Sequence, residues 1–126
     1  MKEYIIETEQ ASKNYGTVRA MDHVSVHVKR GEIYGLIGDN GAGKTTLLKA
    51  LAGHIRLDGG EVRLFGKTGE KALERCRRLI GVMIEEPGYF PELSVEKNME
   101  YYRIMKGIPG KERTEQTLRT VGLWEK

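Results

Sequence analysis

Hydrophobic and polar residues alternate in residues 23–28 and 61–65, and a period of two is typical of a strand with one buried face. Residues 4–8 are also typical of a strand. Asn and Gly in the stretch Lys13–Gly16 predict a turn between the first two strands. The pattern therefore predicts three short, half-buried strands.

Two further segments are continuously apolar rather than alternating. They are residues 33–37, Ile-Tyr-Gly-Leu-Ile, and residues 79–84, Leu-Ile-Gly-Val-Met-Ile. Strands of a parallel sheet have both faces covered and have this kind of sequence. We therefore expect both segments to be buried parallel strands.

Helical patterns lie between and after these strands, at residues 46–52, 70–78, 95–106 and 111–121. The first places Leu47, Leu48 and Leu51 on one face and is followed by Gly53, a common helix-ending residue. Ser94 is a typical N-cap for the third helix. Prolines and glycine within residues 85–93 predict a loop.

Composition is that of an ordinary globular domain. The chain has 126 residues, of which 39% are hydrophobic and 31% charged, and its formal net charge is +3. This mild charge does not indicate a nucleic-acid-binding protein, which would gather its basic residues on one face. Arg75, Arg77 and Arg78 cluster, but Glu70 and Glu74 share their helix, so we expect a solvated helix face.

Cysteine content and hydropathy suggest a location inside the cell. Cys76 is the only cysteine, which excludes a disulfide framework. The first residues lack the apolar stretch of a signal peptide, and no apolar run approaches the roughly 18 residues of a membrane span. Any role at a membrane would then require a partner protein.

Residues 38–45, Gly-Asp-Asn-Gly-Ala-Gly-Lys-Thr, match the phosphate-loop pattern G-x-x-x-x-G-K-[ST]. An apolar segment precedes the loop and a helix follows it, which is the arrangement that a triphosphate requires. Lys44 would reach the β- and γ-phosphates, and the Thr45 hydroxyl would bind Mg²⁺. The alternative is a glycine-rich turn beside an unrelated lysine.

Residues 4–123 resemble the N-terminal part of an ATP-binding cassette (ABC) ATPase. In that family an aromatic residue at the position of Tyr15 stacks on adenine, and Val18 would touch the same base from the side. Without the resemblance, Tyr15 would be an ordinary loop tyrosine. The family's phosphate loop corresponds to Asn40, Gly41, Ala42, Gly43, Lys44, Thr45 and Thr46, which the resemblance implies as ATP-binding residues.

The resemblance implies an α/β fold: part of a P-loop NTPase core with N-terminal antiparallel β strands and the start of a helical subdomain. Residues 1–93 would form the incomplete ATP-binding core with its β subdomain. Residues 94–126 would begin the helical subdomain.

The segment 80–87, followed by Pro-Glu-Leu-Ser-Val at 91–95, resembles the loop that joins these two parts of the family fold. The family normally has glutamine where this chain has Glu85, and some bacitracin-type resistance transporters have glutamate there. A carboxylate is a stronger Mg²⁺ ligand than an amide but repels the γ-phosphate. Glu85 is thus a candidate metal ligand and, with Lys44, a candidate catalytic residue. Glu86 is the neighbouring candidate, and a surface acid on a mere connector is the alternative.

Several family motifs do not occur in the 126 residues: the Ser-Gly-Gly signature, the second aspartate motif, the catalytic glutamate and the switch histidine. His23, His27 and His54 lie elsewhere, and we expect structural roles for them. These omissions predict that the chain is the front part of a longer subunit. Such a piece would bind ATP with Mg²⁺ but would not hydrolyse it alone.

The function implied is nucleotide binding within an ABC transporter subunit that powers export. A membrane-spanning permease, which would determine the transported substrate, and a second cassette in a homodimer would be its partners. It would then lie on the cytoplasmic face of the membrane, without nucleic acid. The alternatives are a soluble ABC ATPase acting on the ribosome or DNA, another P-loop enzyme such as a small kinase, and a non-functional fragment.

Overall fold

The computed structural model describes residues 3–38, 43–85 and 88–125, and it divides into two compact units, Met1–Glu86 and Pro87–Lys126. Within these described residues, the first unit contains three strands and two helices, and the second contains two helices. The division falls inside the loop that the sequence predicts at 85–93. Each unit has its own packing.

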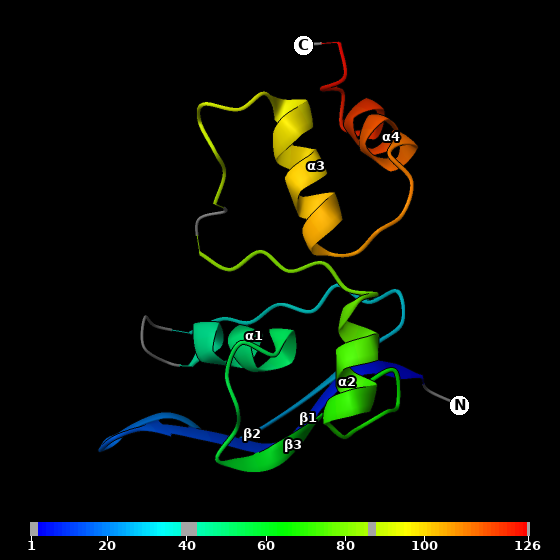
Figure 1. Cartoon of the computed structure of the whole chain (residues 1–126). Coiled ribbons are helices and arrows are strands. Elements are labelled where there is room, and N and C mark those ends of the chain that lie inside the picture. The colour runs from blue at the N-terminus through cyan, green and yellow to red at the C-terminus, as the bar shows by residue number, and fades with distance from the viewer. Residues whose placement is uncertain (1–2, 39–42, 86–87, 126) are drawn as a thin grey trace. The chain divides into compact units, whose positions relative to one another are not determined.

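The strands of the first unit form one antiparallel sheet in the order β2-β1-β3 (Figure 1). They are β1 (Tyr4–Tyr15), β2 (Val18–Lys29) and β3 (Gly59–Leu64). The first two are longer than predicted, and Lys13–Tyr15, predicted as a turn, belong to β1. The turn lies at Gly16 and Thr17 instead, because cross-strand pairing continues to Tyr15 and Val18.

A bulge interrupts the pairing of β1 with β3 between Glu9 and Ser12. Gln10 has a φ of 49° there, and Gly60 opposite it has a φ of 79°. A Cβ atom at Gly60 would lie 2.3 Å from the Gln10 carbonyl oxygen. Only glycine allows the two backbones to approach so closely in this conformation.

Helices α1 (Lys44–Ala52) and α2 (Glu70–Arg77) lie over the same face of the sheet (Figure 1). Leu47 of α1 packs in a buried cluster with Ala11, Met21 and Val26 of the hairpin. A second cluster joins α2 to β3 and consists of Val62, Leu64, Leu73 and Cys76. These clusters confirm the predicted helices, although Leu48, predicted on the buried face of α1, is 38% exposed.

Arg77 joins α2 to the end of α1. Its guanidinium donates to the carbonyl oxygens of Leu51, at 3.1 Å, and Ala50, at 3.4 Å. These carbonyls lie at the C-terminal end of α1, where a cation is favourable. The sequence prediction of a solvated face is therefore wrong for Arg77, whereas Arg75 and Arg78 are exposed as expected.

The second unit pairs α3 (Val95–Met105) with α4 (Glu112–Thr120). Ser94 caps α3 as predicted, since its hydroxyl accepts from the Lys97 amide at 3.2 Å. Glu100 of α3 accepts hydrogen bonds from Arg103 and from the hydroxyl of Thr114 on α4. These bonds lower the pKa of Glu100 to about 2, so its carboxylate stays charged and holds the two helices together at neutral pH.

The two apolar segments predicted as buried strands are neither strands nor buried. Among the described residues, 33–37 and 79–84 pair with no strand. Ile33 and Ile37 are fully exposed, and Leu79 and Met83 are largely exposed. A parallel strand requires a strand neighbour and cover on both faces, and most side chains of these two segments are exposed.

This exposure predicts that the 126-residue chain binds a hydrophobic dye or forms oligomers, because large apolar surfaces favour association. Dye fluorescence and size-exclusion chromatography with light scattering measure the two outcomes. The double variant Ile33→Ser, Ile37→Ser should reduce both effects, since neither side chain supports the core. A monodisperse monomer that binds no dye would contradict the exposed arrangement.

Candidate functional site

The N-terminal end of α1 is the candidate anion site. The helix starts at Lys44 after Gly43, whose φ is 97°, and no side chain among the described residues caps it. The first amide groups of a helix have no partner within the helix and carry a partial positive charge. The first turn contains no acidic residue. A phosphate group would therefore find unpaired donors and no repulsion there.

Gly43 fixes where this helix end lies relative to the sheet. A Cβ atom at Gly43 would lie 2.6 Å from the Ala20 carbonyl oxygen and 3.3 Å from the Met21 side chain. The positive φ and this close approach both require glycine. The start of α1 is thus held against β2.

The phosphate-loop residues are described in part. Lys44 is half-buried, and its ammonium group donates to the carbonyl oxygen of Gly38. Thr45 is exposed and Thr46 half-buried, both in the first turn of α1. Three of the expected ATP-binding residues, Asn40, Gly41 and Ala42, lie outside the described residues.

Tyr15 and Val18 form the end of the β1–β2 hairpin, where they are cross-strand partners. They are 50% and 63% exposed, so both side chains leave surface that a ligand could contact. Val18 lies two residues before Ala20, and Gly43 closely approaches the Ala20 carbonyl. The hairpin end and the first turn of α1 are therefore neighbours, as adenine and phosphate contacts require.

Tyr15 is supported by two side chains that the sequence alone did not single out, Lys13 and Asp58. The Lys13 ammonium lies 5.3 Å from the centre of the Tyr15 ring and 3.9 Å from Asp58. Asp58 also accepts from the Asn14 amide at 2.6 Å. The charge pattern of the hairpin offered no signal for this link, because Asp58 is far from Lys13 in the sequence.

Glu85 lies in the loop after α2 and is exposed. Its φ is 59°, a conformation that non-glycine residues rarely adopt. It makes no hydrogen bond or ion pair with the other described residues, so the structure does not connect it to Lys44 or Thr45.

A family model described as ABC transporter matches residues 21–126, which is most of the chain. The chain belongs to the ABC transporter ATP-binding family. The cassette fold explains why antiparallel strands precede a P-loop helix in this sequence.

Curated members of the family are similar over nearly the whole chain. The bacitracin transport ATP-binding protein BcrA of Bacillus licheniformis is 37% identical over 119 residues, 94% of this chain and 39% of that protein. The methionine import ATP-binding protein MetN of Rhizobium johnstonii is 36% identical over 131 residues, 98% of this chain and 36% of that protein. The chain thus spans about two-fifths of the length of these relatives.

Solved cassettes share the fold. The ATP-binding subunit of an ABC transporter has a TM-score of 0.78 and 27% identity, over 97% of this chain and 52% of that one. A dimeric bacterial ABC transporter cassette has a TM-score of 0.72 and 25% identity, over 90% and 54% of the two chains. The α/β P-loop core with antiparallel strands is therefore the fold of this chain.

The ABC ATPase family binds ATP, generally with Mg²⁺. The described residues of this cassette fit a triphosphate: an uncapped helix start, a glycine at positive φ, a lysine and a threonine in the first turn. Thr45 would hold Mg²⁺ through its hydroxyl, which is exposed and available.

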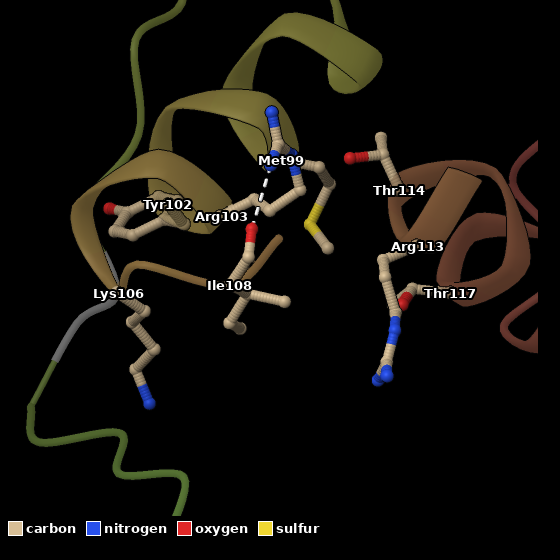
Figure 2. A pocket seen from close by; sticks show the side chains of 8 residues that line it. All are labelled: Met99, Tyr102, Arg103, Lys106, Ile108, Arg113, Thr114 and Thr117. Atoms are coloured by element: carbon tan, nitrogen blue, oxygen red, sulfur yellow. Dashed lines mark hydrogen bonds between the residues drawn. The ribbon is translucent and has the colours of Figure 1, made fainter. Parts of the chain in front are cut away.

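A separate hollow lies in the second unit of the cassette, between α3 and α4 (Figure 2). Met99, Ile108 and Thr117 are among its lining residues, and Arg103, which also lines it, donates to the Ile108 carbonyl oxygen at 2.7 Å. It contains none of the expected nucleotide-binding residues. Among the described residues of the cassette, no helix has the length and apolar character needed to cross a membrane.

The geometry of the hairpin predicts that Tyr15→Ala weakens ATP binding by about 1–3 kcal/mol, because a base loses its stacking surface. Isothermal titration calorimetry with ATP and Mg²⁺ measures the change. Tyr15→Phe is the matched control and should bind ATP as the parent chain does, since it keeps the ring. Equal ATP affinities for Tyr15→Ala and the parent would remove Tyr15 from the site.

Proposed function

We propose that this chain binds ATP and Mg²⁺ as the nucleotide-binding part of an ABC transporter subunit that powers export across a membrane. The observation that carries the proposal is the uncapped N-terminal end of α1, which Gly43 holds against the hairpin that bears Tyr15 and Val18. One site would therefore offer a stacking surface for a base and donors for phosphates.

Each residue contributes a separate interaction. Tyr15 stacks on adenine and Val18 packs against its edge. The amides that start α1 and the residues Asn40, Gly41, Ala42, Gly43 and Thr46 surround the phosphates. Lys44 leaves the Gly38 carbonyl and pairs with the β- and γ-phosphates, where a charge-assisted bond is stronger.

Thr45 and Glu85 provide oxygen atoms for Mg²⁺, which neutralises part of the triphosphate charge. Glu85 lies at the end of the first unit, in a strained backbone conformation that is typical of functional loops. We place it beside the γ-phosphate, where its carboxylate positions the metal. Lys44 and Glu85 are thus the catalytic candidates of this chain.

Hydrolysis and transport belong to the whole protein. We propose that ATP hydrolysis requires a second cassette in a homodimer, a membrane-spanning permease, and a position on the cytoplasmic side of the membrane. The dimeric solved cassette supports the first of these. The carboxylate at Glu85, which some bacitracin-type resistance transporters share, favours export, whereas the similarity to the methionine import protein MetN leaves import as the competing direction.

Lys44→Ala tests the nucleotide site directly. Loss of one bond to a charged group costs about 1.5–3 kcal/mol, so ATP affinity should fall roughly ten- to a hundredfold. Calorimetric titration of the variant and the parent chain with ATP and Mg²⁺ measures the change in affinity. A phosphate-release assay should show no turnover above background for the 126-residue chain.

Lys49→Ala is the matched control, because Lys49 lies in the last turn of the same helix, away from the anion site. It should bind ATP as the parent chain does. If Lys44→Ala also binds ATP like the parent chain, α1 is not a nucleotide site.

Glu85→Gln in the complete subunit should alter the Mg²⁺ dependence of ATP hydrolysis more than the affinity for ADP. Glutamine is a neutral and weaker Mg²⁺ ligand, and ADP lacks the phosphate that Glu85 would oppose. A Mg²⁺ titration of the ATPase rate measures the first effect and calorimetry the second. Glu86→Gln is the control. If Glu86→Gln changes the Mg²⁺ titration and Glu85→Gln does not, the metal ligand is Glu86 rather than Glu85.

A further inference from the structure

On the face of the sheet that α1 and α2 leave uncovered, three metal-ligating side chains converge outside the nucleotide site. Glu7 and Glu9 are two residues apart on β1 and therefore point to the same side. His27 of β2 is the cross-strand partner of Glu7. The buried residues Thr8 and Val26, which alternate with them, point to the covered face.

The ligand atoms already lie close together. The His27 Nε2 atom is 2.7 Å from Glu9 Oε1 and 3.9 Å from Glu7 Oε1. One ligand atom from each residue lies within 4.8 Å of the other two. Ligands around a tetrahedral Zn²⁺ are about 3.3 Å apart, given bonds of about 2.0–2.1 Å, so small side-chain rotations would complete the geometry.

Neighbouring groups hold these side chains in place. The Tyr4 ring lies 5.2 Å from the His27 ring, centre to centre, and limits its orientation. The side chain of Glu7 is only 12% exposed, and its second oxygen, Oε2, lies 3.9 Å from Arg63. The Glu7 oxygen that faces His27 is therefore not the one that faces the guanidinium.

The local charge favours a divalent cation. Glu61 is the cross-strand partner of Glu9, so three carboxylates gather on this face. Arg63 is one neighbouring cation, and it lies closest to Glu61, at 2.5 Å, while Lys29 is two residues from His27 on β2. An excess of negative charge thus remains around His27.

We propose that Glu7, Glu9 and His27 form a Zn²⁺ site with a fourth position open to water. An imidazole nitrogen with two carboxylates suits Zn²⁺, whereas Mg²⁺ prefers oxygen ligands alone. The ion would replace the hydrogen bond between His27 and Glu9, and the remaining imidazole proton would lie on Nδ1. It would also join β1 to β2 at the end of the sheet opposite to Tyr15.

The test is a Zn²⁺ titration of the chain in competition with a chromophoric zinc chelator, without nucleotide. One equivalent should bind, and His27→Ala and Glu9→Gln should each lower Zn²⁺ affinity by at least about tenfold. His23→Ala is the matched control: His23 is on the same strand, exposed and paired with Asp22 at 2.5 Å, so its loss should leave affinity unchanged.

NMR of the unaltered chain tests the proposal without relying on variants, which could fail to fold. Of the three histidine imidazoles, only that of His27 should shift on addition of Zn²⁺, and excess Mg²⁺ should not reproduce the shift. Unchanged Zn²⁺ affinity in His27→Ala, or imidazole shifts at His23 or His54 instead, would overturn the proposal. In that case His27 and Glu9 form a hydrogen-bonded pair only, with Glu7 beside them.

Discussion

The packing of α1 on the β1–β2 hairpin is the contact on which the candidate site depends. Leu47 enters the buried cluster with Ala11, Met21 and Val26, and Gly43 brings the start of the same helix against Ala20. Both ends of the first turn of α1 are thereby held against the hairpin. A larger residue at Gly43 would displace the anion-binding amides from the hairpin that carries Tyr15.

Arg77 fixes the other end of α1. Its bonds to the carbonyls of Ala50 and Leu51 attach α2 to the helix that would bind phosphate. Because α2 packs on β3 through Leu73 and Cys76, the whole first unit supports the position of α1. The candidate nucleotide site is therefore built on packed secondary structure, whereas Glu85 is an exposed residue in a loop.

The two faces of the sheet have different chemistry. The covered face is apolar, apart from Thr8 and Ser12, and Thr8 is satisfied by the backbone of Val24 and Val26. The other face carries the carboxylates and imidazole of the proposed Zn²⁺ site. This division follows from the two-residue period of the strands, which separates adjacent side chains.

Local sequence was sufficient for α1 with its terminating Gly53 and for the Ser94 cap, because each depends on residues a few positions apart. It also located β3 and the pairing of the N-terminal strands in outline. Only the tertiary structure decided the states of 33–37 and 79–84, since a parallel strand exists only beside a partner. The same holds for the Arg77 contacts and for the meeting of Glu7, Glu9 and His27. These contacts bring together residues that are distant in sequence, and a local sequence pattern carries no information on which distant residues meet.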